Sequence, residues 1–247
     1  EPSGTVRAAA LRGEVAITEQ ADLTAEMLMS HKGLITGNQL DQNAMLALKD
    51  ALASFLDHGG HWFFNGHMAR PLVDGIGQYR SIVAPKRQDF GLSSINPHPL
   101  YDGIDLKKIE TNRGVAGFYG RGCNPPPEGA VAVNGLGPAR VPVDWVWARP
   151  RGGRFFSHAG NDLGTSGLEW NLAPDLTRRV INWANGGSCL SSNRFVQTPP
   201  VEDLPLARAE SYGGARDTGR AGPRIVAPSS GTYYHIHSLE GSAYTGI

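Results

Sequence analysis

The sequence has little cysteine, no excess of charge and no long apolar run, and each shortage excludes a class of protein. Cys123 and Cys189 are its only cysteines, too few for a disulfide framework. The 23 Lys and Arg residues balance the 23 Asp and Glu residues without any run of like charge, which disfavours nucleic-acid and anionic-membrane partners. Apolar stretches such as Trp62–Phe64 are far too short to span a bilayer. With an N-terminus (Glu1-Pro2-Ser3) that is not a signal peptide, we expect a cytoplasmic protein without a membrane partner.

The length of 247 residues predicts a single domain with one core and long loops. The 32 glycines and 17 prolines cluster and so mark the loops. Residues 188–222 are rich in Pro, Gly, Ser and Arg and are interpreted as a linker or surface excursion. A homo-oligomer is compatible with the sequence.

The first part of the chain predicts a β-α-β unit. Val15–Ile17 and Gly33–Gly37 are short apolar runs typical of buried parallel strands. Asp41 is suited to cap a helix that continues through Leu56 and ends at a glycine pair. His61–Asn65 then predicts a third buried strand, which ends in a tight turn at Gly66.

Further elements are predicted downstream, although residues 74–113 are too irregular to assign. A helix is expected over Pro174–Ala184, with a proline in its first turn and a buried apolar face. Strands or hairpin arms are expected over Gly114–Tyr119, Ala130–Val133, Val143–Trp147 and Gly153–Ser157.

The order of the elements suggests a circular permutation. Doubly wound α/β domains open with a central strand, but this chain opens with a predicted helix over Thr5–Leu11. Residues 223–247 would supply the missing strand, since Pro223–Ser230 has a strand-then-loop pattern and domain termini often lie close together. The alternative is a complete domain whose C-terminal strand docks beside its first strand. Both hypotheses place Ile225 in the sheet.

Three segments resemble the class I glutamine amidotransferase-like superfamily, in particular its ThuA-like (trehalose-utilisation) branch. They are Leu34–Asn38 with Asp41, Phe55–His67 and Gly152–Leu163. The resemblance implies a flavodoxin-like α/β fold, a three-layer sandwich with a mainly parallel central sheet, here with long loops and some added β-hairpin structure.

The position of the family's nucleophile lacks a thiol. In working amidotransferases the turn after the strand here numbered His61–Phe64 carries a cysteine beside a histidine. Here the turn is Asn65-Gly66-His67, so the resemblance does not imply glutaminase activity by the usual Cys-His mechanism. Cys123, in a glycine- and proline-rich loop, is the candidate for a relocated nucleophile.

A site is expected at the carboxyl ends of the strands, where open α/β sheets bind ligands. The predicted catalytic group is His67, His158, His235 and Asp162, and the predicted ligand-binding residues are Asn38, Asp41, Asn65, Asn161, Ser230 and Tyr234. Histidines together with a carboxylate could hold a divalent metal ion. The sequence contains no metal-ligand motif, however, and we assign no residue as a metal ligand. Hydrogen bonding to a sugar-like ligand needs no nucleophile. The alternative is that these residues merely satisfy loop backbone groups.

Three functions follow. The first is a ThuA-like protein that binds or processes a small polar, carbohydrate-like ligand, as a hydrolase or isomerase. The second is a catalytically silent scaffold or regulatory domain. The third is an amidotransferase-like enzyme that uses Cys123. Fold alone does not choose between them.

Overall fold

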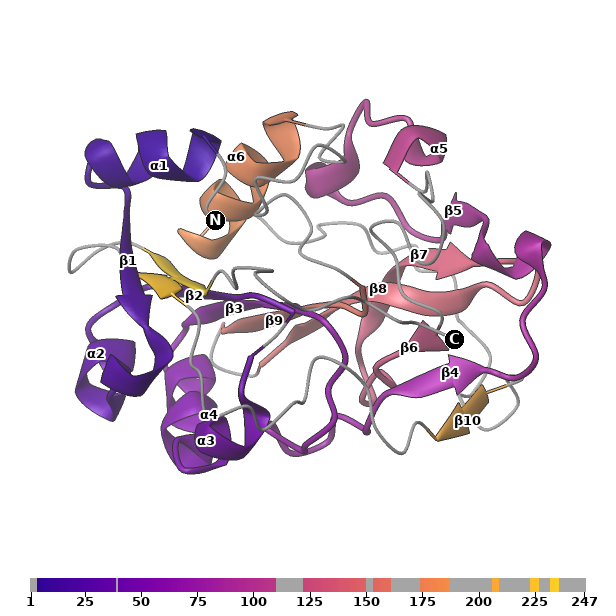
Figure 1. Ribbon diagram of the computed structural model, residues 1–247. Helices are drawn as coiled ribbons and strands as arrows, with labels where there is room; N and C mark the ends of the chain where they lie inside the picture. The colour runs from indigo at the N-terminus through magenta and orange to yellow at the C-terminus, as the bar shows by residue number, and fades with distance from the viewer. Residues whose placement is uncertain are drawn as a thin grey trace.

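The computed structural model describes residues 4–38, 40–109, 122–149, 153–160 and 174–186, with the backbone of three strands at 206–208, 223–226 and 232–235. It combines helices with a mixed sheet and so confirms the predicted α/β class (Figure 1). Within these residues no helix combines the length and the apolar character needed to cross a membrane.

The main sheet has nine strands in the order β1-β11-β12-β2-β3-β9-β8-β7-β5. The central strands β12, β2, β3 and β9 run parallel, and the strands from β8 to β5 extend the sheet in antiparallel fashion. The bounds are β1 Val15–Glu19, β2 Gly33–Thr36, β3 His61–Asn65, β5 Leu92–Ser94, β7 Val131–Leu136, β8 Val141–Ala148, β9 Arg154–His158, β11 Pro223–Val226 and β12 Thr232–His235.

Helices cover both faces of the central strands. Because neighbouring residues of a strand point to opposite faces, Phe63 and Phe156 enter one core cluster while Trp62 and Phe155 enter the other. The first cluster lies under α1 (Gly4–Leu11) and α6 (Pro174–Ala184). The second lies under α2 (Ala25–Met29), α3 (Gln42–Leu46) and α4 (Lys49–Asp57), on the opposite side in Figure 1.

The helix expected from Asp41 through Leu56 is two helices, which corrects that prediction. Asp41 caps α3 as expected, since its Oδ1 accepts the amides of Asn43 and Ala44 at 3.0 and 3.1 Å. The end of α3 then tightens, because the amide of Leu48 bonds back only three residues, at 3.0 Å. The chain restarts as α4 with its apolar face on the sheet.

The sequence predicts no element over residues 74–113, and the described part of this segment forms short elements with little periodicity. Two of its strands, β4 (Arg80–Ile82) and β5, join different sheets. A smaller sheet has the order β10-β4-β6 and includes β6 (Gly122–Cys123) and β10 (Leu206–Arg208). Hence part of the predicted linker 188–222 pairs in a sheet. The short helices are η1 (Gln20–Asp22), η2 (Arg87–Phe90), η3 (Pro99–Tyr101) and α5 (Leu106–Ile109).

Two strands from the end of the chain lie in the main sheet. Ile225 belongs to β11, which confirms that this strand joins the sheet. The chain then reverses into β12, which pairs in parallel with both β1 and β2. Tyr234 and His235 therefore lie in β12, and do not follow the Ile225 strand as its carboxyl end. The predicted strand Gly114–Tyr119 lies outside the described residues.

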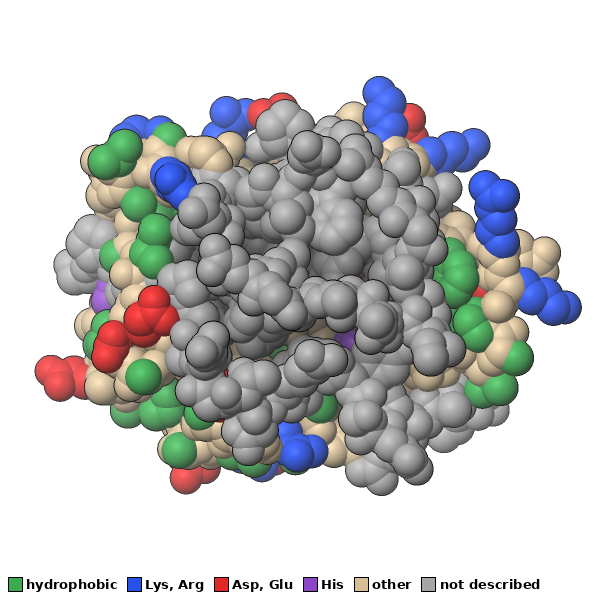
Figure 2. Space-filling model, in the orientation of Figure 1, with side chains coloured by type: hydrophobic (Ala, Val, Ile, Leu, Met, Phe, Trp, Pro, Cys, Tyr) green, Lys and Arg blue, Asp and Glu red, His purple; other side chains and the backbone are tan. Residues whose placement is uncertain are grey.

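Basic and acidic side chains are interspersed around the rim of the face in Figure 2. Acidic side chains lie at the edge of α2, which has Glu26 in its first turn. Basic side chains lie at the edge of α5, which has Lys107 and Lys108 in its last turn.

Candidate functional site at the carboxyl ends of the central strands

The parallel strands deliver polar residues to one edge of the sheet. Thr36, Asn65 and His158 are the last residues of β2, β3 and β9. His235 is the last residue of β12, which runs the same way. The rule that open α/β sheets bind ligands at the carboxyl ends of their strands thus selected an edge where several strand ends lie together.

His67 is held just beyond β3 by a glycine turn and an aromatic neighbour. Gly66 has a φ of +102°, and a Cβ there would lie 2.8 Å from the Cα of Asn38, so only glycine fits without strain. The His67 ring stacks on Tyr79 with centroids 3.7 Å apart. The backbone carbonyl of His67 accepts from the Gln42 side chain at 2.6 Å. These contacts fix the imidazole near the sheet edge.

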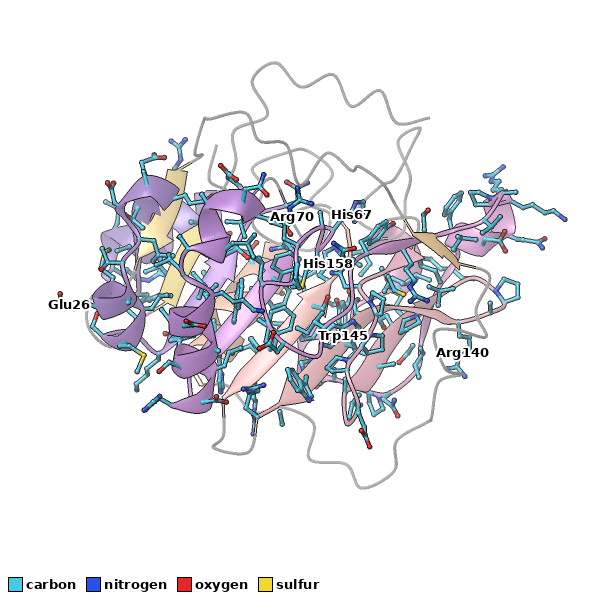
Figure 3. The ribbon with its side chains drawn as sticks, turned by 90° about the horizontal axis from the view of Figure 1, so that it is seen from below. Glu26, His67, Arg70, Arg140, Trp145 and His158 are labelled. Atoms are coloured by element: carbon cyan, nitrogen blue, oxygen red, sulfur yellow. The ribbon has the colours of Figure 1, made fainter. Side chains whose placement is uncertain are left out.

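The structure brings His67 and His158 together. The amide of Gly66 donates to the carbonyl of His158 at 2.9 Å, which joins the turn to the end of β9. Figure 3 shows both histidines at the centre of the molecule, with Arg70 beside His67. Burial, with a smaller effect from the nearby His158, lowers the pKa of His67 to about 3. His67 is therefore a neutral imidazole near pH 7.

A buried carboxylate that the sequence did not indicate orients His158. The Oδ1 of Asp144 lies 2.7 Å from the Nδ1 of His158, and both side chains are fully buried. The Oδ2 of Asp144 accepts from the hydroxyl of Tyr101 and from the side-chain amide (Nδ2) of Asn134, each at 2.7 Å. Three donors thus converge on one carboxylate.

Sheet register produces this row of polar side chains. His158 of β9 lies opposite Asp144 of β8, and Asp144 lies opposite Asn134 of β7. Directly opposed residues point to the same face, so the three side chains meet. Tyr101 reaches the row from η3, above that face. Because β8 is antiparallel to β9, the rule about the ends of parallel strands could not find Asp144.

The Asp144 bond sets the chemistry of His158. When Nδ1 donates to a carboxylate, the neutral ring carries its proton there, and Nε2 is the basic nitrogen. A carboxylate in this position also stabilises the imidazolium that forms when Nε2 accepts a proton. The pair is therefore suited to general acid–base chemistry.

His98 is a further residue near the site that sequence reasoning missed. Its Nδ1 accepts the amide of Leu100 at 3.3 Å as the cap of η3, and its ring meets Phe156 edge-on at 5.3 Å. Burial lowers the pKa of His98 to about 4; the charge of Asp144 opposes the shift and Arg154 adds to it. His98 is also neutral near pH 7.

The other predicted site residues divide into two groups. Asn65 donates to the carbonyl of Thr36 at 3.0 Å, and Asp41 caps α3, so both have structural partners. Asn38 lies against Gly66 at the same edge. For Tyr234 and His235 only the backbone is described, and Asn161, Asp162 and Ser230 lie outside the described residues.

Cys123 does not have the surroundings of a nucleophile. Its side chain is fully buried in β6, and burial raises the pKa of the thiol to about 12, although Arg80 acts in the opposite direction. Because the thiolate is the reactive species, the thiol is inert at neutral pH. Cys189 lies outside the described residues.

No protein-family model, curated protein sequence or solved structure matches the chain. The case for a function therefore rests on the geometry of the site.

The described side chains offer no metal centre. No group of three or more His, Cys, Asp or Glu residues among them could hold an ion. Asp144 instead takes its three hydrogen bonds from protein donors.

One signal in the sequence could have revealed the missed carboxylate. Asp144 is the only charged residue in β8, whose sequence is VPVDWVWA. A lone carboxylate inside an apolar strand must be paired or hydrogen-bonded if it is buried. Asn134 interrupts the apolar strand β7 in the same way. No comparable pattern marks Tyr101 or His98, because they lie in an irregular segment.

The two buried neutral histidines predict that the protein loses stability in acid. An unfolded histidine takes up a proton near pH 6.5, whereas His67 and His98 do so only at about 3 and about 4 in the fold. Between these values the unfolded chain binds more protons, so stability is complete above pH 6.5 and falls as the pH drops. Each histidine contributes up to about 1.4 kcal/mol per pH unit.

Urea unfolding at pH 7, 6 and 5 checks this. His67→Phe keeps an aromatic ring beside Tyr79, and His98→Asn keeps an acceptor for the Leu100 amide, so each should fold with a shallower pH dependence. His58→Asn removes an exposed histidine at the end of α4 and serves as the matched control. Equal slopes in all four proteins would show that the buried rings are protonated in the fold.

Proposed function

We propose that the protein binds a small polar, carbohydrate-like ligand at the carboxyl ends of β2, β3 and β9, and processes it by proton transfer through His158. The reaction class is that of a hydrolase or an isomerase. The observation that carries the proposal is the bond from His158 to the buried Asp144, which makes Nε2 the basic nitrogen of the ring.

The turn after β3 supports chemistry without a protein nucleophile. Asn65-Gly66-His67 supplies neither a thiol nor a hydroxyl. A general base can instead activate water or remove a proton from the ligand itself. His67, neutral and next to His158, is suited to hydrogen-bond the ligand without competing for its proton.

The fold proposed for this function is a ThuA-like, flavodoxin-like three-layer sandwich. The helices on both faces of the parallel strands support it. The place of β12, parallel to β1 and β2, supports the circular permutation in which residues 223–247 supply the first strand. His235 ends β12 three strands away from β9, about 14 Å at the usual strand spacing. A ligand in contact with both ends must extend across β2 and β3.

A ligand panel tests the proposal. Calorimetry with neutral mono- and disaccharides should find binding, whereas L-glutamine should not bind. Nuclear magnetic resonance (NMR) of the mixtures then reports whether a bound sugar is converted. His158→Asn keeps a donor toward Asp144 but removes Nε2, so it should bind the sugar and lose conversion by about a hundredfold or more. His67→Phe should weaken binding, and His58→Asn should match the natural protein.

Each alternative function has its own outcome. Hydrolysis of L-glutamine would contradict the proposal and favour the amidotransferase. A folded protein that binds no sugar would leave the silent scaffold as the function.

A further inference from the structure

Within the part of the chain that the structure describes, two buried polar atoms beside Asp144 have no hydrogen-bond partner. They are Nε2 of His98 and Oδ1 of Asn134, on side chains that are 2% and 1% exposed. Buried polar groups are nearly always hydrogen-bonded, because leaving one unpaired is costly. Two such atoms around one carboxylate therefore point to a group that binds there.

Three contacts hold the segment of His98 against β7 and Asp144. The amide of Ile95 donates to the carbonyl of Val133 at 2.7 Å, and the Asn96 side chain donates to the carbonyl of Ala132 at 2.7 Å. Three residues after His98, the hydroxyl of Tyr101 reaches Asp144. The side-chain amide of Asn134 donates to the same carboxylate oxygen. His98 and Asn134 thus belong to one small region of the fold.

The hydrogen bonds of the two side chains fix the polarity of these atoms. Nδ1 of His98 accepts from Leu100, so the neutral ring carries its proton on Nε2, which is a donor. The amide nitrogen of Asn134 faces Asp144, so Oδ1 is an acceptor. One donor and one acceptor, with no positive charge, suit a neutral group that can both accept and donate. A hydroxyl does this, whereas a carboxylate or phosphate would meet the acceptor oxygen unfavourably.

We infer that His98 Nε2 and Asn134 Oδ1 form a subsite for a hydroxyl group of the ligand, next to the His158–Asp144 pair. This rests on the proposed function and specifies its substrate class as an uncharged polyhydroxy compound. His98 donates to the hydroxyl oxygen, and the hydroxyl hydrogen is donated to Asn134. His98 and Asn134 are binding residues here, and His158 remains the proton acceptor.

Imidazole NMR of the full chain tests the subsite, with glycerol and D-glucose as probes. Both should shift the signals of the His98 ring and of the Asn134 side-chain amide in a saturable way. Their fully O-methylated counterparts keep every oxygen but have no O–H, and should leave these signals unchanged. His98→Asn retains the cap on Leu100 and removes Nε2, so it should weaken binding about tenfold. His58→Asn, at an exposed position, should bind as the natural protein does.

The outcomes separate the subsite from the function. Probes that shift His67 and His158 but not His98, with unchanged affinity in His98→Asn, would overturn the subsite and leave the proposed function intact. A His98 N–H that exchanges magnetisation with water alone, whatever the probe concentration, would show an ordered water only and would likewise overturn it. No shift at any of the three histidines would overturn both.

Discussion

Replacing Asp144 with asparagine is expected to destabilise the protein by about 3 kcal/mol and to move the proton of neutral His158 from Nδ1 to Nε2. The carboxylate is fully buried, and every hydrogen bond that it accepts comes from a buried side chain. Asparagine keeps the volume but turns one acceptor into a donor. One of the three donors then faces another donor, unless the His158 ring moves its proton to the other nitrogen.

The arrangement of the donors decides which bond is lost. Tyr101 and Asn134 both donate to Oδ2, so the single oxygen of an asparagine is best placed there. Its amide group then faces Nδ1 of His158, which can accept only without its proton. The neutral ring must then carry its proton on Nε2, so Nε2 can no longer accept a proton from the ligand.

Urea unfolding and ¹⁵N NMR of the imidazole measure the two effects separately. Tyr101→Phe removes one donor, so it should cost about 1.5–3 kcal/mol without changing the tautomer. Asp175→Asn alters an exposed carboxylate paired with Arg178 and should change stability by less than about 0.5 kcal/mol. A proton that stays on Nδ1 in Asp144→Asn would show that His158 does not depend on Asp144 for its tautomer. General-base chemistry at Nε2 would then lose its support.

The central strands were predictable because their signals are local. Buried parallel strands are short apolar runs between glycines, and β2, β3 and β9 all have that pattern. The ends of such strands meet at one edge, so the sequence was enough to bring His67 and His158 together. The helix over Pro174–Ala184 was found with the predicted bounds for a similar reason, since its apolar face has a clear period.

The pairing of His158 with Asp144 was not predictable from the sequence, because it depends on the register of the sheet. Asp144 meets His158 only because β8 pairs with β9 in one particular alignment, and a shift of one residue would turn the carboxylate to the other face. Tyr101 lies in the short 3₁₀ helix η3 and His98 caps it, in an irregular segment where no apolar period exists to place them. In the pair at the centre of the proposed function, the position of His158 thus follows from a local pattern, whereas its contact with Asp144 depends on tertiary structure.

Asp41 shows how one residue type supports two interpretations. A carboxylate after a strand could bind a ligand or cap the next helix, and sequence position is the same in both cases. In the structure its Oδ1 accepts two amides of α3, and its own backbone exchanges hydrogen bonds with the Gln20 side chain. The cap explains this residue without a ligand.

The substitution Gly153→Ala is expected to destabilise the protein by more than about 3 kcal/mol, beyond the usual cost of overpacking. A Cβ at this position would overlap the carbonyl oxygen of Leu56 and lie 2.6 Å from its carbonyl carbon and 3.0 Å from the carbonyl oxygen of Gly60. All these atoms belong to the backbone, so no side-chain rotation can relieve the overlap. Gly91→Ala is the matched control, because φ there is −64° and its nearest contact, 3.5 Å from the carbonyl oxygen of Gln88, is ordinary.

The effect should spread to the site, because Gly153 sets how closely β9 begins beside β3. The amide of Arg154 donates to the carbonyl of Gly60 at 3.0 Å, the first link between the two strands. Pushing this end of β9 away strains the ladder that runs up to Asn65 and His158. Thermal unfolding measures the stability, and the imidazole signals of His67 and His158 report the site. A Gly153→Ala protein as stable as Gly91→Ala, with unchanged histidine signals, would show that β9 does not need this close approach to hold His158 in place.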